Sequence, residues 1–90
     1  MNALIYLNLQ HGPYLEQDDL ERLDTLRRYT QDTGYTVSQV WPVYEPEDAR
    51  DRSREWYGAK DDLADGRFDA IVYWFDPNSA PDIFTQDDLN

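Results

Sequence analysis

The 90 residues of the chain are enough for one domain with a modest core, and 40% of them are hydrophobic, which excludes a disordered chain. There is no cysteine, which excludes disulfides and thiolate metal sites. Eight Lys and Arg against 19 Asp and Glu give a net charge of −11, so direct binding to a phosphate backbone is not expected. No apolar run reaches the roughly 20 residues that span a bilayer, and the N-terminus lacks a signal-peptide pattern. We therefore expect a cytoplasmic protein that does not contact a membrane.

The first half of the chain predicts a strand, a helix and a second strand. Residues 3–9 (ALIYLNL) form an almost continuous apolar run, which is typical of a strand buried on both faces. Apolar residues at helical spacing predict a helix over residues 18–32. Residues 35–44 are rich in β-branched and aromatic side chains and predict a strand. Pro42 places this strand at a sheet edge, because proline cannot donate a hydrogen bond to a neighbouring strand.

The second half predicts a helix, a strand and an acidic tail. A charged connection over residues 45–53 leads into a helix from about Ser53 to Asp65, where apolar residues recur at helical spacing. Residues 68–75 (FDAIVYWF) predict the strongest strand, again apolar on both faces. Residues 79–90 follow as an acidic C-terminal tail, anchored only by Ile83, Phe84 and Leu89.

This order of elements predicts an α/β fold with β-α-β-α-β connectivity. Short right-handed crossovers imply a small parallel sheet in the strand order second, first, third, with helices packed against it. We expect one domain over residues 1–78 and a tail over residues 79–90. The third strand would leave a flat apolar edge, and such edges pair with other chains unless they are covered. We expect the tail to cover this edge through Ile83 and Phe84, with a homodimer as the other outcome.

Three blocks of the sequence resemble one known family. They are ALIYLNLQ (residues 3–10), TLRRYTQDTGYTV (residues 25–37) and GRFDAIVYW (residues 66–74), in matching order and spacing. Together they resemble the N-terminal part of the serine recombinase (resolvase/invertase) catalytic domain. The resemblance implies a resolvase-like fold, and in the family a serine attacks a DNA phosphodiester while arginines bind the phosphate and an aspartate orients them.

Most of the residues that this chemistry needs are missing from the chain. The resemblance places Asn8 at the family's arginine position and Gln10 at the nucleophile position, directly before His11. An amide has no oxygen of useful nucleophilicity, so cleavage of DNA is not expected. The family positions that the chain retains are Arg52, Arg54 and Asp76. We therefore expect no enzymatic activity, no catalytic residue, no metal and no cofactor.

Three other chemical interpretations of the polar residues are possible. His11 could act as a general base, but a lone histidine on a turn without a nearby nucleophile is usually a surface residue. Asp76 could be a phosphoacceptor like that of receiver domains, but the acidic pair that would hold magnesium is absent. Adjacent carboxylates point in different directions on a helix and are expected to be solvated rather than to bind metal. They are the pairs Asp18–Asp19 and Asp61–Asp62.

Aromatic residues make up 14% of the chain, more than a small core can hide, and exposed aromatics are enriched at protein interfaces. Three tyrosines without an evident buried place are candidate partner contacts: Tyr14, Tyr44 and Tyr57.

We expect a catalytically inactive resolvase-like module, of the kind that a phage or mobile element encodes, which binds a protein. The partner would be basic, a recombinase or a second copy, and would contact the strand ends around residues 8–13 and 76–79 and the acidic helix faces.

A second hypothesis rests on charge alone. An acidic protein of this size can imitate DNA phosphates and inhibit a nucleic-acid-binding protein. Such a mimic needs its carboxylates on one contiguous face, whereas a partner-binding module needs a mixed surface with aromatic anchors.

Overall fold

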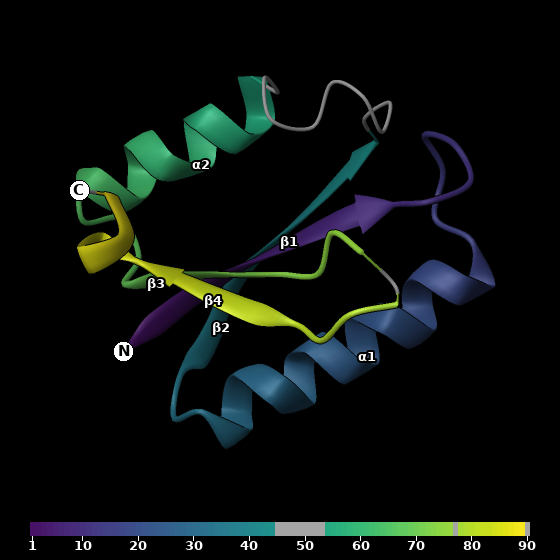
Figure 1. Cartoon of the computed structure of the whole chain (residues 1–90), viewed down its shortest axis with the longest axis horizontal. Helices are drawn as coiled ribbons and strands as arrows, with labels where there is room; N and C mark the ends of the chain where they lie inside the picture. Colours follow the sequence, from purple (N-terminus) through teal and green to yellow (C-terminus); the bar gives the residue numbers. More distant parts are fainter. Residues whose placement is uncertain (45–53, 77, 90) are drawn as a thin grey trace.

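A computed structural model describes residues 1–44, 54–76 and 78–89 of the chain (Figure 1). Its strands are β1 (Asn2–Leu9), β2 (Thr36–Tyr44), β3 (Ala70–Tyr73) and β4 (Asp82–Thr85). Its helices are α1 (Gln17–Asp32), α2 (Arg54–Ala64) and a final 3-10 turn, η2 (Gln86–Leu89). No helix in these described ranges is long and apolar enough to cross a membrane.

The four strands form one mixed sheet in the order β2-β1-β3-β4. β1 pairs in parallel with β2 and with β3, and β4 pairs antiparallel with β3. The helices α1 and α2 lie on opposite sides of this sheet (Figure 1). The predicted α/β class is confirmed, whereas the prediction of a sheet with only three, all parallel, strands is wrong because the chain adds β4.

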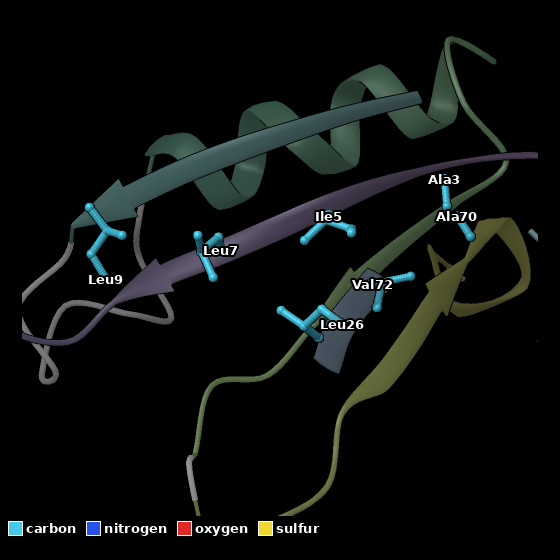
Figure 2. Close-up of a cluster of buried hydrophobic side chains, with 7 residues drawn as sticks. All are labelled: Ala3, Ile5, Leu7, Leu9, Leu26, Ala70 and Val72. Carbon is cyan, nitrogen blue, oxygen red and sulfur yellow. The ribbon is translucent and has the colours of Figure 1, made fainter. Parts of the chain in front are cut away.

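β1 is the centre of the core, because its residues from Ala3 to Leu9 are all buried. Successive side chains of a strand point to opposite faces, so this one strand contributes to two hydrophobic clusters. The cluster on the α1 side contains Leu26 of α1 between the sheet residues (Figure 2). Its buried members are Ala3, Ile5, Leu7, Leu9, Leu26, Ala70 and Val72.

The cluster on the α2 side is built around aromatic rings. The Trp56 ring of α2 meets Tyr6, Phe75 and Phe84 edge to face, with centroid distances of 5.2, 5.0 and 5.6 Å. Such edge-to-face pairs stabilise beyond the apolar area that they bury. Ala59 and Leu63 complete the buried face of α2.

β2 is an edge strand, as Pro42 predicts. Within the described part of the chain its only strand neighbour is β1, and Pro42 lies opposite Leu7 and is exposed. Gly34, which joins α1 to β2, has a φ of 92°, a left-handed conformation that favours glycine at the end of a helix. The observed ends of α1 and β2 lie within one or two residues of the ends predicted from the sequence.

β3 is shorter than predicted, because the ladder includes only residues 70–73 of the predicted 68–75. Phe68 is buried in the α2-side cluster without joining the ladder. The far edge of β3 is covered by β4, in which Ile83 lies opposite Val72 and Phe84 opposite Ile71. The expected docking of these two tail residues is thereby confirmed, and the residues predicted as a tail supply a strand of the sheet.

A cross-strand side-chain contact accompanies the pairing of β3 with β4. The Tyr73 hydroxyl donates to the Asp82 carboxylate at 3.3 Å. Burial raises the pKa of the Tyr73 hydroxyl above its ordinary value, and the negative charge of Asp82 raises it further. The hydroxyl therefore stays protonated and can donate. The predicted charged connection, with Ser53 and Arg52, lies in residues 45–53, outside the described residues.

Candidate functional site

The loop over residues 10–16 joins the end of β1 to α1 and forms the candidate site. In open α/β sheets, ligands bind outside the carboxyl ends of the strands. Gly12 takes a φ of 132°, which other residues rarely adopt, and this turns the chain away from the sheet. Glu16 then caps α1, and its carbonyl accepts from the Leu20 backbone N–H at 3.1 Å.

The three residues predicted at this strand end are not equivalent. Asn8 is buried, and its side-chain oxygen has no hydrogen-bond partner among the described residues. Gln10 is half-buried, and its side-chain amide donates to the Asn8 carbonyl at 3.4 Å. His11 is exposed, and its Nε2 lies 3.1 Å from the Asp18 carboxylate. Of the three, only Gln10 and His11 line the pocket described next.

A pocket of about 270 Å³ lies at this end of the sheet and is lined by Gln10, His11, Asp18 and Arg22. The side chains of these four residues include no hydroxyl or thiol, so they supply no nucleophile of the serine or cysteine type. Across residues 1–44, 54–76 and 78–89, no three histidine, aspartate or glutamate side chains gather as a metal-ligand set. The chemistry that this lining offers is hydrogen bonding and charge.

Asp19 holds the loop in place from inside the fold, and this corrects the expectation that it is solvated. Its side chain is fully buried, and it accepts from the backbone N–H of Glu16 at 2.9 Å and of Gln10 at 3.3 Å. It also pairs with the Arg22 guanidinium one turn along α1. One carboxylate therefore ties both ends of the loop to the helix.

The ionised form of Asp19 is the one that this network favours. Burial is the largest single influence and opposes ionisation. The hydrogen bonds from Glu16, Arg22 and Gln10 together outweigh burial, so the pKa of Asp19 lies below its ordinary value. A negative charge within the first turn of α1 is also favoured by the helix dipole.

Arg22 connects this carboxylate to the sheet. Its Nη2 donates to the backbone carbonyl of Asn8 at 2.7 Å and to Asp19. Its Nε and Nη1 atoms are buried and have no hydrogen-bond partner in residues 1–44, 54–76 and 78–89. Sequence reasoning missed both Asp19 and Arg22, although the three-residue spacings Glu16–Asp19 and Asp19–Arg22 are a local signal for a cap and an ion pair.

Several exposed apolar side chains belong to the segments at this end of the sheet. Tyr14 and Leu15 lie in the loop, Leu20 lies in the first turns of α1, and Tyr44 ends β2 opposite Leu9. Tyr14 is 78% exposed and Tyr44 50%. The carboxyl ends of β1 and β2 and the loop lie together in Figure 1. We call this the strand-end surface: Tyr14, Leu15, Leu20 and Tyr44 with the exposed acids Glu16, Asp18 and Glu21.

The remaining predicted residues lie elsewhere. Tyr57 is on α2, and the Lys60 ammonium lies over its ring at 4.8 Å. Arg54 is the exposed first residue of α2. Asp76 is exposed after β3, and its carboxylate accepts from the Asn78 backbone N–H at 2.9 Å, within a local turn. Tyr14 and Tyr44 therefore belong to segments at the same end of the sheet, whereas neither Arg54 nor Asp76 is part of the pocket lining.

Comparisons with protein-family models, with curated proteins and with solved structures found no match for the chain.

Proposed function

We propose that the chain is a catalytically inactive, resolvase-like module that binds a basic protein through its strand-end surface. The observation that carries the proposal is the exposure of four large apolar side chains on the loop, the first turns of α1 and the end of β2. Large exposed apolar side chains at one place on a small protein are typical of an interaction site. Aromatic anchors such as Tyr14 and Tyr44 supply much of the binding energy of protein interfaces.

The charges around these anchors favour a basic partner. The acids of the strand-end surface, Glu16, Asp18 and Glu21, are exposed. Arg22, the cation in the pocket lining, is committed to Asp19 and to the end of β1. With a net charge of −11, the protein would attract a basic surface and accelerate its approach.

The absence of catalysis is supported by the amides at the resolvase-like positions. Asn8 is enclosed in the core, and the Gln10 amide is bonded to the Asn8 carbonyl. The parallel placement of β1 between β2 and β3 is compatible with a resolvase-like sheet.

The proposal is tested by affinity capture from the source cells, followed by direct binding of the purified captured protein. The variant Tyr14→Ala/Tyr44→Ala removes both aromatic anchors, and Tyr57→Ala is the matched control on α2. We expect the double variant to weaken binding at least tenfold, because each lost anchor costs on the order of 1 kcal/mol or more. We expect Tyr57→Ala to bind like the unmodified protein.

The salt dependence of the same complex distinguishes the DNA-mimic hypothesis. A partner held by aromatic anchors associates more slowly above ~0.15 M salt, where charges are screened beyond about 8 Å, but its dissociation changes little. A DNA mimic would lose most of its affinity with salt and would be insensitive to the tyrosine substitutions. Equal binding by the double variant and by Tyr57→Ala would overturn the proposal.

A further inference from the structure

The outer edge of β2 has no strand beside it in the described part of the chain. Such an edge presents unpaired N–H and C=O groups to which a strand of another chain can bind, and many proteins prevent this with charged side chains. β2 has no such charge, because its sequence TVSQVWPVY contains no Asp, Glu, Lys or Arg, although 30% of the chain is charged. The geometry of its backbone therefore decides whether the edge can pair.

The pairing of β2 with β1 shows which backbone groups of β2 point outward. In a strand, the N–H and C=O of one residue point to one side within the sheet, and those of the next residue point to the other side. The Thr36 N–H donates to the Met1 carbonyl at 2.8 Å, so the backbone groups of Thr36 face β1. Counting along β2 starts from this residue.

A bulge at Ser38 shifts the alternation once. Val37 lies opposite Ala3 and Gln39 lies opposite Leu4, so Ser38 is an extra residue of β2. Beyond the bulge, the residues whose backbone groups point to β1 are Gln39, Trp41 and Val43. The residues whose backbone groups point outward are Val40, Pro42 and Tyr44.

Pro42 is the middle residue of this outward-facing row. Because proline has no N–H, a strand added at the edge would find donors at Val40 and Tyr44 but none between them. On the other side of Val40, the bulge at Ser38 breaks the regular two-residue spacing. No stretch from Val37 to Tyr44 therefore offers consecutive donors at the spacing that a regular ladder requires.

We propose that Pro42, together with the bulge at Ser38, closes the outer edge of β2 to strand addition, so that copies of the chain do not pair there. The net charge of −11 also opposes contact between copies, but salt screens this repulsion, whereas the missing N–H acts at any ionic strength. This inference does not depend on the proposed function.

Amide hydrogen exchange of the unmodified full chain, without a partner, tests the geometry of the edge. We expect the Val40 amide to exchange at least about tenfold faster than the amides of Trp41 and Val43, because only the latter two point to β1. A Val40 amide that exchanges as slowly as that of Trp41 would show that another strand or segment occupies the edge. That result would overturn the proposal.

The variant Pro42→Thr tests the role of the proline. It restores an N–H on the outward side, and the ladder with β1 stays intact because Pro42 does not donate to it. Threonine favours strands without adding apolar surface. The matched control is Pro13→Thr, which replaces an exposed proline of the loop over residues 10–16.

Sedimentation in about 1 M sodium chloride, where charges are screened beyond about 3 Å, compares the two variants with the unmodified protein. We expect Pro42→Thr to self-associate at a concentration at least about tenfold lower than the other two proteins, with slower exchange of its Val40 amide. A Pro42→Thr variant that is as monomeric as Pro13→Thr, or that associates without protecting Val40, would contradict the proposal. The exchange measurement on the unmodified protein decides the geometry even if Pro42→Thr does not fold.

Discussion

Asp19 is the residue on which the geometry of the candidate site depends. It is fully buried and accepts hydrogen bonds from Gln10 and Glu16 at the two ends of the loop and from Arg22. Arg22 in turn donates to the Asn8 carbonyl at the end of β1. This short chain of contacts fixes the loop against the sheet and the first turn of α1, so the pocket and the strand-end surface depend on it.

Replacing Asp19 by asparagine tests this dependence. Asp19→Asn keeps the shape but removes the charge that Arg22 requires, and losing one partner of a buried ion pair destabilises a protein by roughly 3 kcal/mol or more. We expect a loss of about this size in the free energy of unfolding measured with urea. Asp32→Asn, an exposed residue at the end of the same helix, is the control and should change it by less than about 0.5 kcal/mol. Equal stability of the two variants would contradict the role of Asp19.

The same residue predicts how stability depends on pH. The pKa of Asp19 is lower in the fold than the ordinary value of 3.8, so its stabilising contribution is complete above that value. The contribution is lost as the pH falls below it, through the pKa of the folded state. We expect the stability difference between the unmodified protein and Asp19→Asn to be constant from neutral pH down to about 5 and to shrink below about pH 4. The other carboxylates are common to both proteins and cancel in the difference, so a gap that stays constant down to pH 3 would be evidence against the pairing.

At the scale of elements, β4 is the segment that completes the sheet. It covers the outer edge of β3 with Ile83 and Phe84, whose side chains enter the two clusters on opposite faces. The following turn, η2, is attached to α2, because the Gln86 side chain donates to the Leu63 carbonyl at 2.8 Å. The last residues of the described chain therefore contribute to the core as well as to the negative charge.

Truncation after Ser79 removes β4 and η2 and exposes the apolar edge of β3. We expect the shortened protein to self-associate or precipitate, because an uncovered strand edge pairs with other chains. Sedimentation measures this, and truncation after Thr85, which keeps β4, is the control and should remain less associated. A protein shortened after Ser79 that is as soluble and as monomeric as the full chain would show that β4 does not protect the sheet.

The elements differ in how far the sequence alone could predict them. β1 and α1 were predictable because an apolar run and a helical spacing of leucines directly encode which faces are buried. β4 has only four residues and no distinctive pattern, so only the uncovered edge of β3 pointed to it. Burial of Asp19 was not predictable from its neighbours, since it depends on where the loop returns to the helix. The pocket needs Arg22 beside Gln10, a proximity that arises only when α1 packs back on β1.

At the scale of the whole molecule, we expect that the chain does not cleave DNA. It contains no lysine or arginine after Arg67, so the region after β3 offers no cation for a phosphate. We expect no nicking and no covalent protein–DNA adduct, also for the variant Asn8→Arg/Gln10→Ser, because the other phosphate-binding arginines remain absent. An active serine recombinase on the same DNA is the positive control. A phosphoserine-linked product formed by the unmodified protein or by the Asn8→Arg/Gln10→Ser variant would be incompatible with an inactive module.

We propose that the molecule acts through the strand-end surface. Amide hydrogen exchange of the protein, alone and in complex with its purified captured partner, measures this most directly. We predict slower exchange on binding in the loop over residues 10–16, in the first turns of α1 and at Tyr44, with α2 and β4 unchanged. Protection confined to α2 or β4, or spread evenly over the acidic faces of both helices, would contradict the claim.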